Sequence, residues 1–172
     1  MPIDLILPVS ISFALAAWTL VFYWYIHPIA RKYPFENVVE PLLLLHAFRY
    51  IGLMFLIPGI TSAPLDIRFA HPAAYGDLVA AVMAYAAIIA IRLDSNWVHG
   101  LVWVFNIWGL ADLVNAVTSG ILFTPDGDLG ATFWIPAVLV PLLVVSHIYI
   151  FYLLIKEIKI SIEPAQSVRC KV

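Results

Sequence analysis

Residues 97–122 decide the fold, and they read WVHGLVWVFNIWGLADLVNAVTSGIL. The stretch is long and apolar enough for a transmembrane helix. At 100° per residue its polar and aromatic side chains fall on two faces. One face carries Phe105, Trp108, Asp112, Asn115 and Ser119, and the other carries His99, Trp103 and Asn106. An aspartate facing lipid costs roughly 2.5–3.5 kcal/mol or more. We therefore expect other helices on both sides, with this helix at the centre of the fold.

Composition places the whole chain in the membrane class. Of its 172 residues, 63% are hydrophobic and 12% are charged, whereas soluble domains carry about 25% charged residues. The net charge of -2, without any run of basic residues, gives no support for a nucleic-acid partner. The single cysteine, Cys170, excludes an intramolecular disulfide.

Five apolar segments are each long enough to cross a bilayer core of roughly 30 Å at 1.5 Å per residue. They span residues 5–26, 38–57, 73–91, 97–122 and 132–155. The predicted fold is an all-α integral membrane protein, a five-transmembrane-helix bundle. It forms one domain over residues 1–156, followed by a short cytoplasmic tail at residues 157–172.

Basic residues predict the orientation. Arg31 and Lys32 follow the first segment, Arg92 follows the third, and four more basic residues follow the fifth, whereas the opposite side carries only Arg68. Cytoplasmic loops are enriched in lysine and arginine. We expect the N-terminus outside and the C-terminus in the cytoplasm, in a bacterial cytoplasmic (inner) membrane.

The second segment contains a deep arginine in the sequence LLLLHAFRYIG. On an α-helix His46, Arg49 and Tyr50 share one face. Arg49 lies too deep for its head to reach the surface easily, so it needs a partner. Counted along the helices, Asp112 lies at the same depth. We predict an Arg49–Asp112 ion pair, with Asn115 or Tyr50 taking the remaining hydrogen bonds.

Asp77 is the alternative partner for Arg49, or it marks an outer vestibule. The ion pair itself has two interpretations. It either holds two helices in register or anchors the polar headgroup of a ligand.

Two histidines are predicted to lie at the same depth when counted from the cytoplasmic side of the membrane. His46, His147 and Asn106 all lie roughly 12–14 Å from the cytoplasmic surface. Two imidazoles at equal depth on different helices are what a bis-histidine haem b site requires, and Asn106 or Ser146 would supply the hydrogen-bond acceptor. The alternatives are histidines that hydrogen-bond to neighbouring helices, and an acid–base or proton-relay role.

The third segment is rich in alanine. Small residues recur on one face at Gly76, Ala80, Ala84 and Ala87. Such a face lets two helices approach closely in lipid. It predicts close packing, either within the monomer or between the protomers of a homo-oligomer.

Two prolines interrupt the fifth segment. Pro136 and Pro141 remove backbone donors, which favours a kink. Such a kink would open an apolar pocket beside Trp108 and Trp134.

The leading functional hypothesis is a protein that binds or senses a lipidic or amphipathic small molecule through an intramembrane polar cluster. Arg49 would meet an anionic headgroup, and Trp108 would pack on the apolar body. The cluster comprises His46, Arg49, Tyr50, Trp108, Asp112, Asn115 and His147, supported by Asn106 and Asp77. The expected partners are membrane lipids and a small apolar ligand.

Three other classes stay open. The first is a haem b or quinone-linked electron carrier, with His46 and His147 as ligands. The second is a membrane enzyme acting on an apolar substrate, with a histidine as general acid or base beside Asp112. The third is a structural subunit without a site.

Overall fold

The computed structural model describes the backbone of residues 5–124 and 128–169, with side chains described up to residue 158. Five helices are long and apolar enough to cross a membrane, as predicted. Their bounds are Ile6–Ala30, Phe35–Leu56, Ile67–Arg92, Val98–Phe123 and Gly130–Ile158. The third begins at Ile67, six residues before the predicted start at residue 73, and includes Pro72.

Three of the spans are built from more than one kind of helix. The first comprises α1 (Ile6–Val21), the π-helical turn η2 (Phe22–Ile26) and α2 (His27–Ala30), and the second comprises α3 (Phe35–Ala47) and the 3₁₀ helix η3 (Phe48–Leu56). The third and fourth are single helices, α4 (Ile67–Arg92) and α5 (Val98–Phe123). The fifth comprises η4 (Gly130–Phe133), the π-helical turn η5 (Ile135–Leu139) and α6 (Val140–Arg169).

Helix α6 is longer than the predicted fifth segment. It continues to Arg169, so most of residues 157–172, predicted as a short tail, are helical. Cys170 lies outside the described residues.

The 3₁₀ helix η3 changes which side chains of the second span face inward. A 3₁₀ helix has 3.0 residues per turn, so side chains at i and i+3 eclipse one another. The buried residues of η3 follow this period: Arg49, Gly52 and Phe55. Tyr50, which an α-helix would place beside Arg49, is instead 46% exposed.

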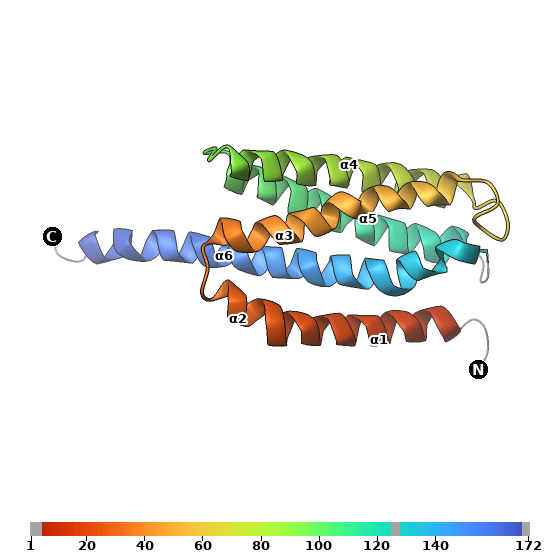
Figure 1. Ribbon diagram of the computed structural model, residues 1–172, viewed down its shortest axis with the longest axis horizontal. Coiled ribbons are helices and arrows are strands. Elements are labelled where there is room, and N and C mark those ends of the chain that lie inside the picture. Colours follow the sequence, from red (N-terminus) through yellow and green to blue (C-terminus); the bar gives the residue numbers. More distant parts are fainter. Residues whose placement is uncertain (1–4, 125–127, 170–172) are drawn as a thin grey trace.

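The helices lie side by side, with α1 at one edge (Figure 1). Helix α4 contacts α3, η3 and α5, while α6 contacts α5, α3 and α1. The second span is the most enclosed, since 50% of its most apolar stretch is buried against 33% for α5. The prediction that the fourth helix is central is therefore wrong, because α5 leaves one face, including Val104 and Ile107, uncovered.

The small-residue face of α4 is used inside the chain. Ala80, Ala84 and Ala87 are completely buried, in a helix that contacts η3, α3 and α5. A homo-oligomer could not form through this face without separating those helices. The opposite face presents larger side chains to the surroundings, among them Val82 and Tyr85.

Ion pairs and hydrogen bonds stabilise the ends of the helices. Asp66 caps α4, because its carboxylate accepts a hydrogen bond of 2.8 Å from the backbone N–H of Arg68. At the other end of α4, Arg92 Nε donates to Glu40 of α3 at 2.6 Å. The hydrogen bond of 2.9 Å from Ala131 N–H to Ile60 O joins η4 to the loop before α4.

Candidate functional site

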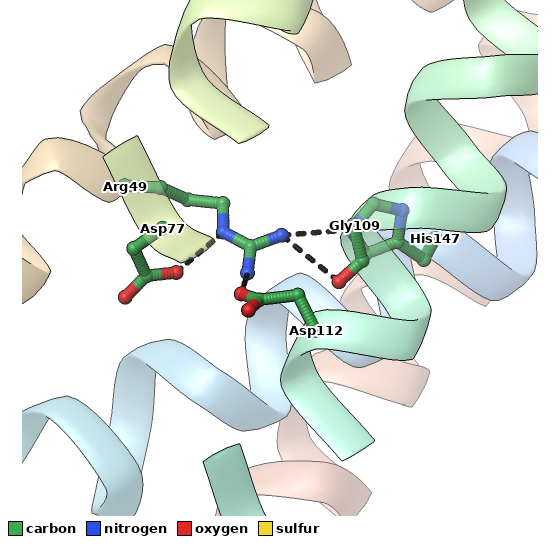
Figure 2. A network of polar contacts seen from close by, with 5 residues as sticks. All are labelled: Arg49, Asp77, Gly109, Asp112 and His147. Atoms are coloured by element: carbon green, nitrogen blue, oxygen red, sulfur yellow. Dashed lines mark hydrogen bonds and ion pairs between the residues drawn. The ribbon is translucent and has the colours of Figure 1, made fainter. Parts of the chain in front are cut away.

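Arg49 is the centre of a polar network that joins four spans (Figure 2). Its Nε donates to Asp77 Oδ1 and its Nη2 donates to Asp112 Oδ2, each at 2.7 Å. Its Nη1 donates to the carbonyl oxygen of Gly109 at 3.0 Å and lies 3.3 Å from His147 Nε2. The Arg49 side chain is 0% exposed. All three nitrogens of the guanidinium therefore have partners inside the protein.

The predicted Arg49–Asp112 ion pair is confirmed, and Asp77 is a second partner rather than a competing one. A guanidinium presents five donors in a planar fork, so different nitrogens can bind separate carboxylates. In this way Arg49 joins α4 to α5 from the second span. The hydrogen bonds predicted for Asn115 or Tyr50 do not form, since the remaining Arg49 donor, Nη1, lies against Gly109 O and His147 Nε2.

Asp77, Asp112 and His147 each lie against a glycine of a neighbouring helix. A Cβ atom at any of these glycines would lie closer than 3.0 Å to a network side chain, a distance that real Cβ atoms essentially never show. The pairs are Gly52 with Asp77, Gly76 with Asp112, and Gly109 with His147. Because the missing side chains make the room for the polar groups, the three glycines are as much a part of the site as the charges.

His147 is held by Asn106 through two hydrogen bonds. His147 Nδ1 lies 2.7 Å from Asn106 Oδ1, and Asn106 Nδ2 donates to the backbone carbonyl of His147 at 3.1 Å. An amide oxygen only accepts, so Nδ1 must carry the hydrogen. Nε2 then faces the Arg49 donor as an acceptor. This pattern assigns His147 the neutral form protonated at Nδ1.

His46 lies against the ring of His147 and is also fully buried. The two ring centroids are 4.1 Å apart at an interplanar angle of 45°. His46 Nε2 lies 3.1 Å from the Ser146 hydroxyl, whereas His46 Nδ1 is buried without a hydrogen-bond partner. The sequence placed these histidines in one layer, and the structure brings them into direct contact.

This arrangement does not fit a haem bound by His46 and His147. In a bis-imidazole site the iron and its macrocycle lie between the two rings, with one nitrogen on each face. Ring centroids 4.1 Å apart leave no space for a porphyrin. Moreover, both ring nitrogens of His147 already take part in hydrogen bonds.

Three residues of the predicted polar cluster lie outside the network. Tyr50 and Trp108 are 46% and 47% exposed, and Asn115 is exposed as well. On α5 the inward face carries Phe105, Asn106, Gly109 and Leu113, so Trp108 and Asn115 point away from the core. The network therefore consists of His46, Arg49, Asp77, Asn106, Asp112 and His147, together with Ser146, which the sequence already offered as a partner of the histidines. Sequence reasoning missed the role of the three glycines.

A separate apolar groove lies between the first two spans. Its volume is about 390 Å³, and α1, η2 and α2 form one wall and α3 the other. Its lining includes Trp18, Phe22, Ile29, Val38, Leu45 and Leu142. The pocket predicted beside Trp108 and Trp134 is not this one, and both of those tryptophans are largely exposed.

The groove exists because α1 is attached to the fifth span rather than to α3. Helix α1 contacts α6 and η5. Trp18 Nε1 donates to the carbonyl oxygen of Val138, at 3.2 Å, in the π-helical turn η5. Pro136 lies in this turn and Pro141 follows it in α6; both lack backbone N–H groups, which disturbs the regular helical hydrogen bonding. The predicted effect of the prolines thus takes the form of a π-helical turn that receives a tryptophan from α1.

Comparison with known proteins places the chain in a family. Searches of curated proteins and of solved structures give no significant match. A family model described as a domain of unknown function (DUF8737) matches residues 6–155. The match begins at the first residue of α1 and runs through all five spans. The chain belongs to this family, the domain of unknown function DUF8737.

Proposed function

We propose that this protein binds an amphipathic molecule, a hydrocarbon chain with an anionic headgroup, in the groove between α1 and α3. The observation that carries the proposal is the groove itself. Its volume of about 390 Å³ lies within the range of small-molecule sites, about 300–1,000 Å³. Its position between two membrane spans gives a ligand access from within the bilayer.

The groove suits a hydrocarbon chain in its length and its chemistry. Its wall runs from Trp18 to Ile29, a rise of about 16 Å at 1.5 Å per residue. Apart from Asn37, the lining side chains are apolar or aromatic. Bilayer lipid is just as apolar, so transfer from lipid into the groove supplies little free energy by itself. The headgroup must therefore provide the preference for one ligand over bulk lipid.

Arg31 and Lys32 are the groups that would bind an anionic headgroup. They are exposed in the turn between α2 and α3. Arg31 comes two residues after Ile29, and both basic residues precede Asn37 and Val38; Ile29, Asn37 and Val38 line the groove. Glu36, in the first turn of α3, is the one acidic residue between Ala30 and Val38. The net charge of this stretch is therefore positive. Each basic residue near a membrane surface contributes about 1 kcal/mol toward an anionic lipid.

This proposal moves the headgroup away from Arg49, where sequence reasoning placed it. Arg49 is completely buried and already binds two carboxylates, a carbonyl oxygen and an imidazole nitrogen. A headgroup at Arg49 would have to displace one of those partners. Arg31 and Lys32 require no such exchange.

The test is binding of a fluorescent fatty acid to the full-length protein in mild detergent. Leu45→Trp fills the groove, because Leu45 lines it, and Leu44→Trp is the matched control on the exposed face of the same helix. We expect saturable binding that Leu45→Trp abolishes and Leu44→Trp preserves. Equal binding by both variants would mean that the groove holds only ordinary annular lipid.

The headgroup has its own test. Arg31→Gln combined with Lys32→Gln should weaken binding about thirty-fold, since two contributions of about 1 kcal/mol add to about 2 kcal/mol. Lys156→Gln, a basic residue of α6 that does not line the groove, is the control. If the variant with Arg31→Gln and Lys32→Gln binds as tightly as Lys156→Gln, the basic turn has no role in binding.

We also propose that the N-terminus lies outside and the C-terminus in the cytoplasm of a bacterial inner membrane. The positive-inside rule supports this orientation. Arg31 and Lys32 lie in the turn between α2 and α3, and Arg92 ends α4; both turns lie on the same side of the bundle as the C-terminal end of α6 (Figure 1). The sequence has one cysteine, Cys170. A membrane-impermeant maleimide should label it in inside-out vesicles and not in intact spheroplasts; the reverse pattern would invert the orientation.

A further inference from the structure

The buried ion-pair network contains unequal numbers of opposite charges. Arg49 contributes one positive charge, and Asp77 and Asp112 each contribute one negative charge when ionised. With both carboxylates ionised the triad of Arg49, Asp77 and Asp112 would carry a net charge of minus one. An uncompensated charge is costly within a bilayer.

The groups around the triad do not supply the missing positive charge. Among the described residues of the elements packed against it, the other titratable groups beside it are His147 of α6, which contacts Arg49, and His46 of α3, which contacts His147. His147 directs Nε2 toward an Arg49 donor, so it cannot hold a second proton there. His46 Nδ1 is buried without an acceptor, which leaves a charged imidazolium unsatisfied. Both histidines are therefore neutral in this arrangement.

Each carboxylate keeps one oxygen that Arg49 does not use. Arg49 bonds Asp77 through Oδ1 and Asp112 through Oδ2, and the structure shows no hydrogen bond for the other two oxygens within the described chain. Unlike the Arg49 side chain, these side chains are not sealed, being 14% and 8% exposed. They lie about 15 Å from the nearer ends of α4 and α5, counted from Ile67 and Phe123.

We propose that the triad is a proton-binding site that holds one exchangeable proton. The proton comes from water and forms an O–H bond at the free oxygen of Asp77 or Asp112, which converts one carboxylate into a carboxylic acid. The triad then has a net charge of zero, and Arg49 keeps all its hydrogen bonds. The site is separate from the groove, so this inference does not depend on the proposed ligand.

Infrared spectroscopy of the full-length protein in detergent tests the proposal directly. At neutral pH we expect a carboxylic-acid C=O band that corresponds to one protonated group per chain and shifts to lower frequency in D₂O. Asp77→Asn and Asp112→Asn should each remove the whole band, because one carboxylate balances Arg49 without a proton. Glu40→Gln is the control, since Glu40 pairs with Arg92 at the end of α4.

The wild-type spectrum can overturn the proposal even where a variant fails to fold. Absence of the band at neutral pH would overturn the proposal, and so would a band that does not shift in D₂O, since its proton would not exchange with water. A band that survives in both asparagine variants would assign the proton to another carboxyl group. A band lost in Glu40→Gln would do the same.

Discussion

Replacing Arg49 with methionine should destabilise the protein more than any exposed charge substitution. Methionine keeps an unbranched apolar side chain, but it removes the bonds to Asp77, Asp112, Gly109 and His147. Removing one partner of a buried ion pair costs about 3–5 kcal/mol, because the other charge is left uncompensated. Since about 1.4 kcal/mol is a factor of ten, the folding equilibrium constant should fall by about two to three and a half orders of magnitude.

The assay is reversible unfolding in mixed micelles of mild detergent and sodium dodecyl sulfate, followed by tryptophan fluorescence. Arg92→Met is the control, because Arg92 is 72% exposed and exposed ion pairs contribute about 0–1 kcal/mol. Combining Arg49→Met with Asp77→Asn and Asp112→Asn should recover much of the loss, since no charge then remains buried. A loss below about 1 kcal/mol for Arg49→Met alone would refute the view that the network holds the helices together.

Two further substitutions test other parts of the structure. Gly76→Ala should destabilise the protein by about 1–3 kcal/mol through overpacking, because its Cβ would overlap the Asp112 carboxylate. Gly100→Ala should instead stabilise the protein by about 0.5–1 kcal/mol, since nothing lies within 4 Å of a Cβ there. Equal shifts of the two variants in the same unfolding assay would contradict this. The hydrogen bonds from Arg68 lower the pKa of Asp66 to about 2 from an ordinary value of 3.8. A depressed pKa stabilises the fold above the ordinary value, so the stability difference between wild type and Asp66→Asn should be constant above about pH 5 and shrink as the pH falls from there toward 2, as unfolding at stepped pH would show.

Much of the fold could be predicted from the sequence because its signals are local. The apolar composition and the lengths of the segments identify five spans without knowledge of their neighbours. The depth of Arg49 and Asp112 follows from counting residues along each helix. That count, with the cost of a buried charge, was enough to predict their pairing.

The angular positions of side chains were predicted less well. The 3₁₀ helix over residues 48–56 has a period of 3.0 instead of 3.6, so His46 and Arg49 stay together while Tyr50 turns outward. On α5 two polar faces were visible in the sequence, but the buried face, with Gly109, lies between them. A helix wheel gives relative angles only, and the neighbouring helices decide which angle faces the core.

The sequence by itself therefore determined the all-helical class of the protein, its five helices long and apolar enough to cross a membrane, and the need of Arg49 for an acidic partner. These depend on hydropathy and on depth along single helices. Tertiary structure alone decided that Arg49 binds both Asp77 and Asp112, that His46 and His147 touch, and that α1 leaves a groove beside α3. Each of these depends on which helices are neighbours and how closely glycines let them approach, and neither property is encoded in any one segment.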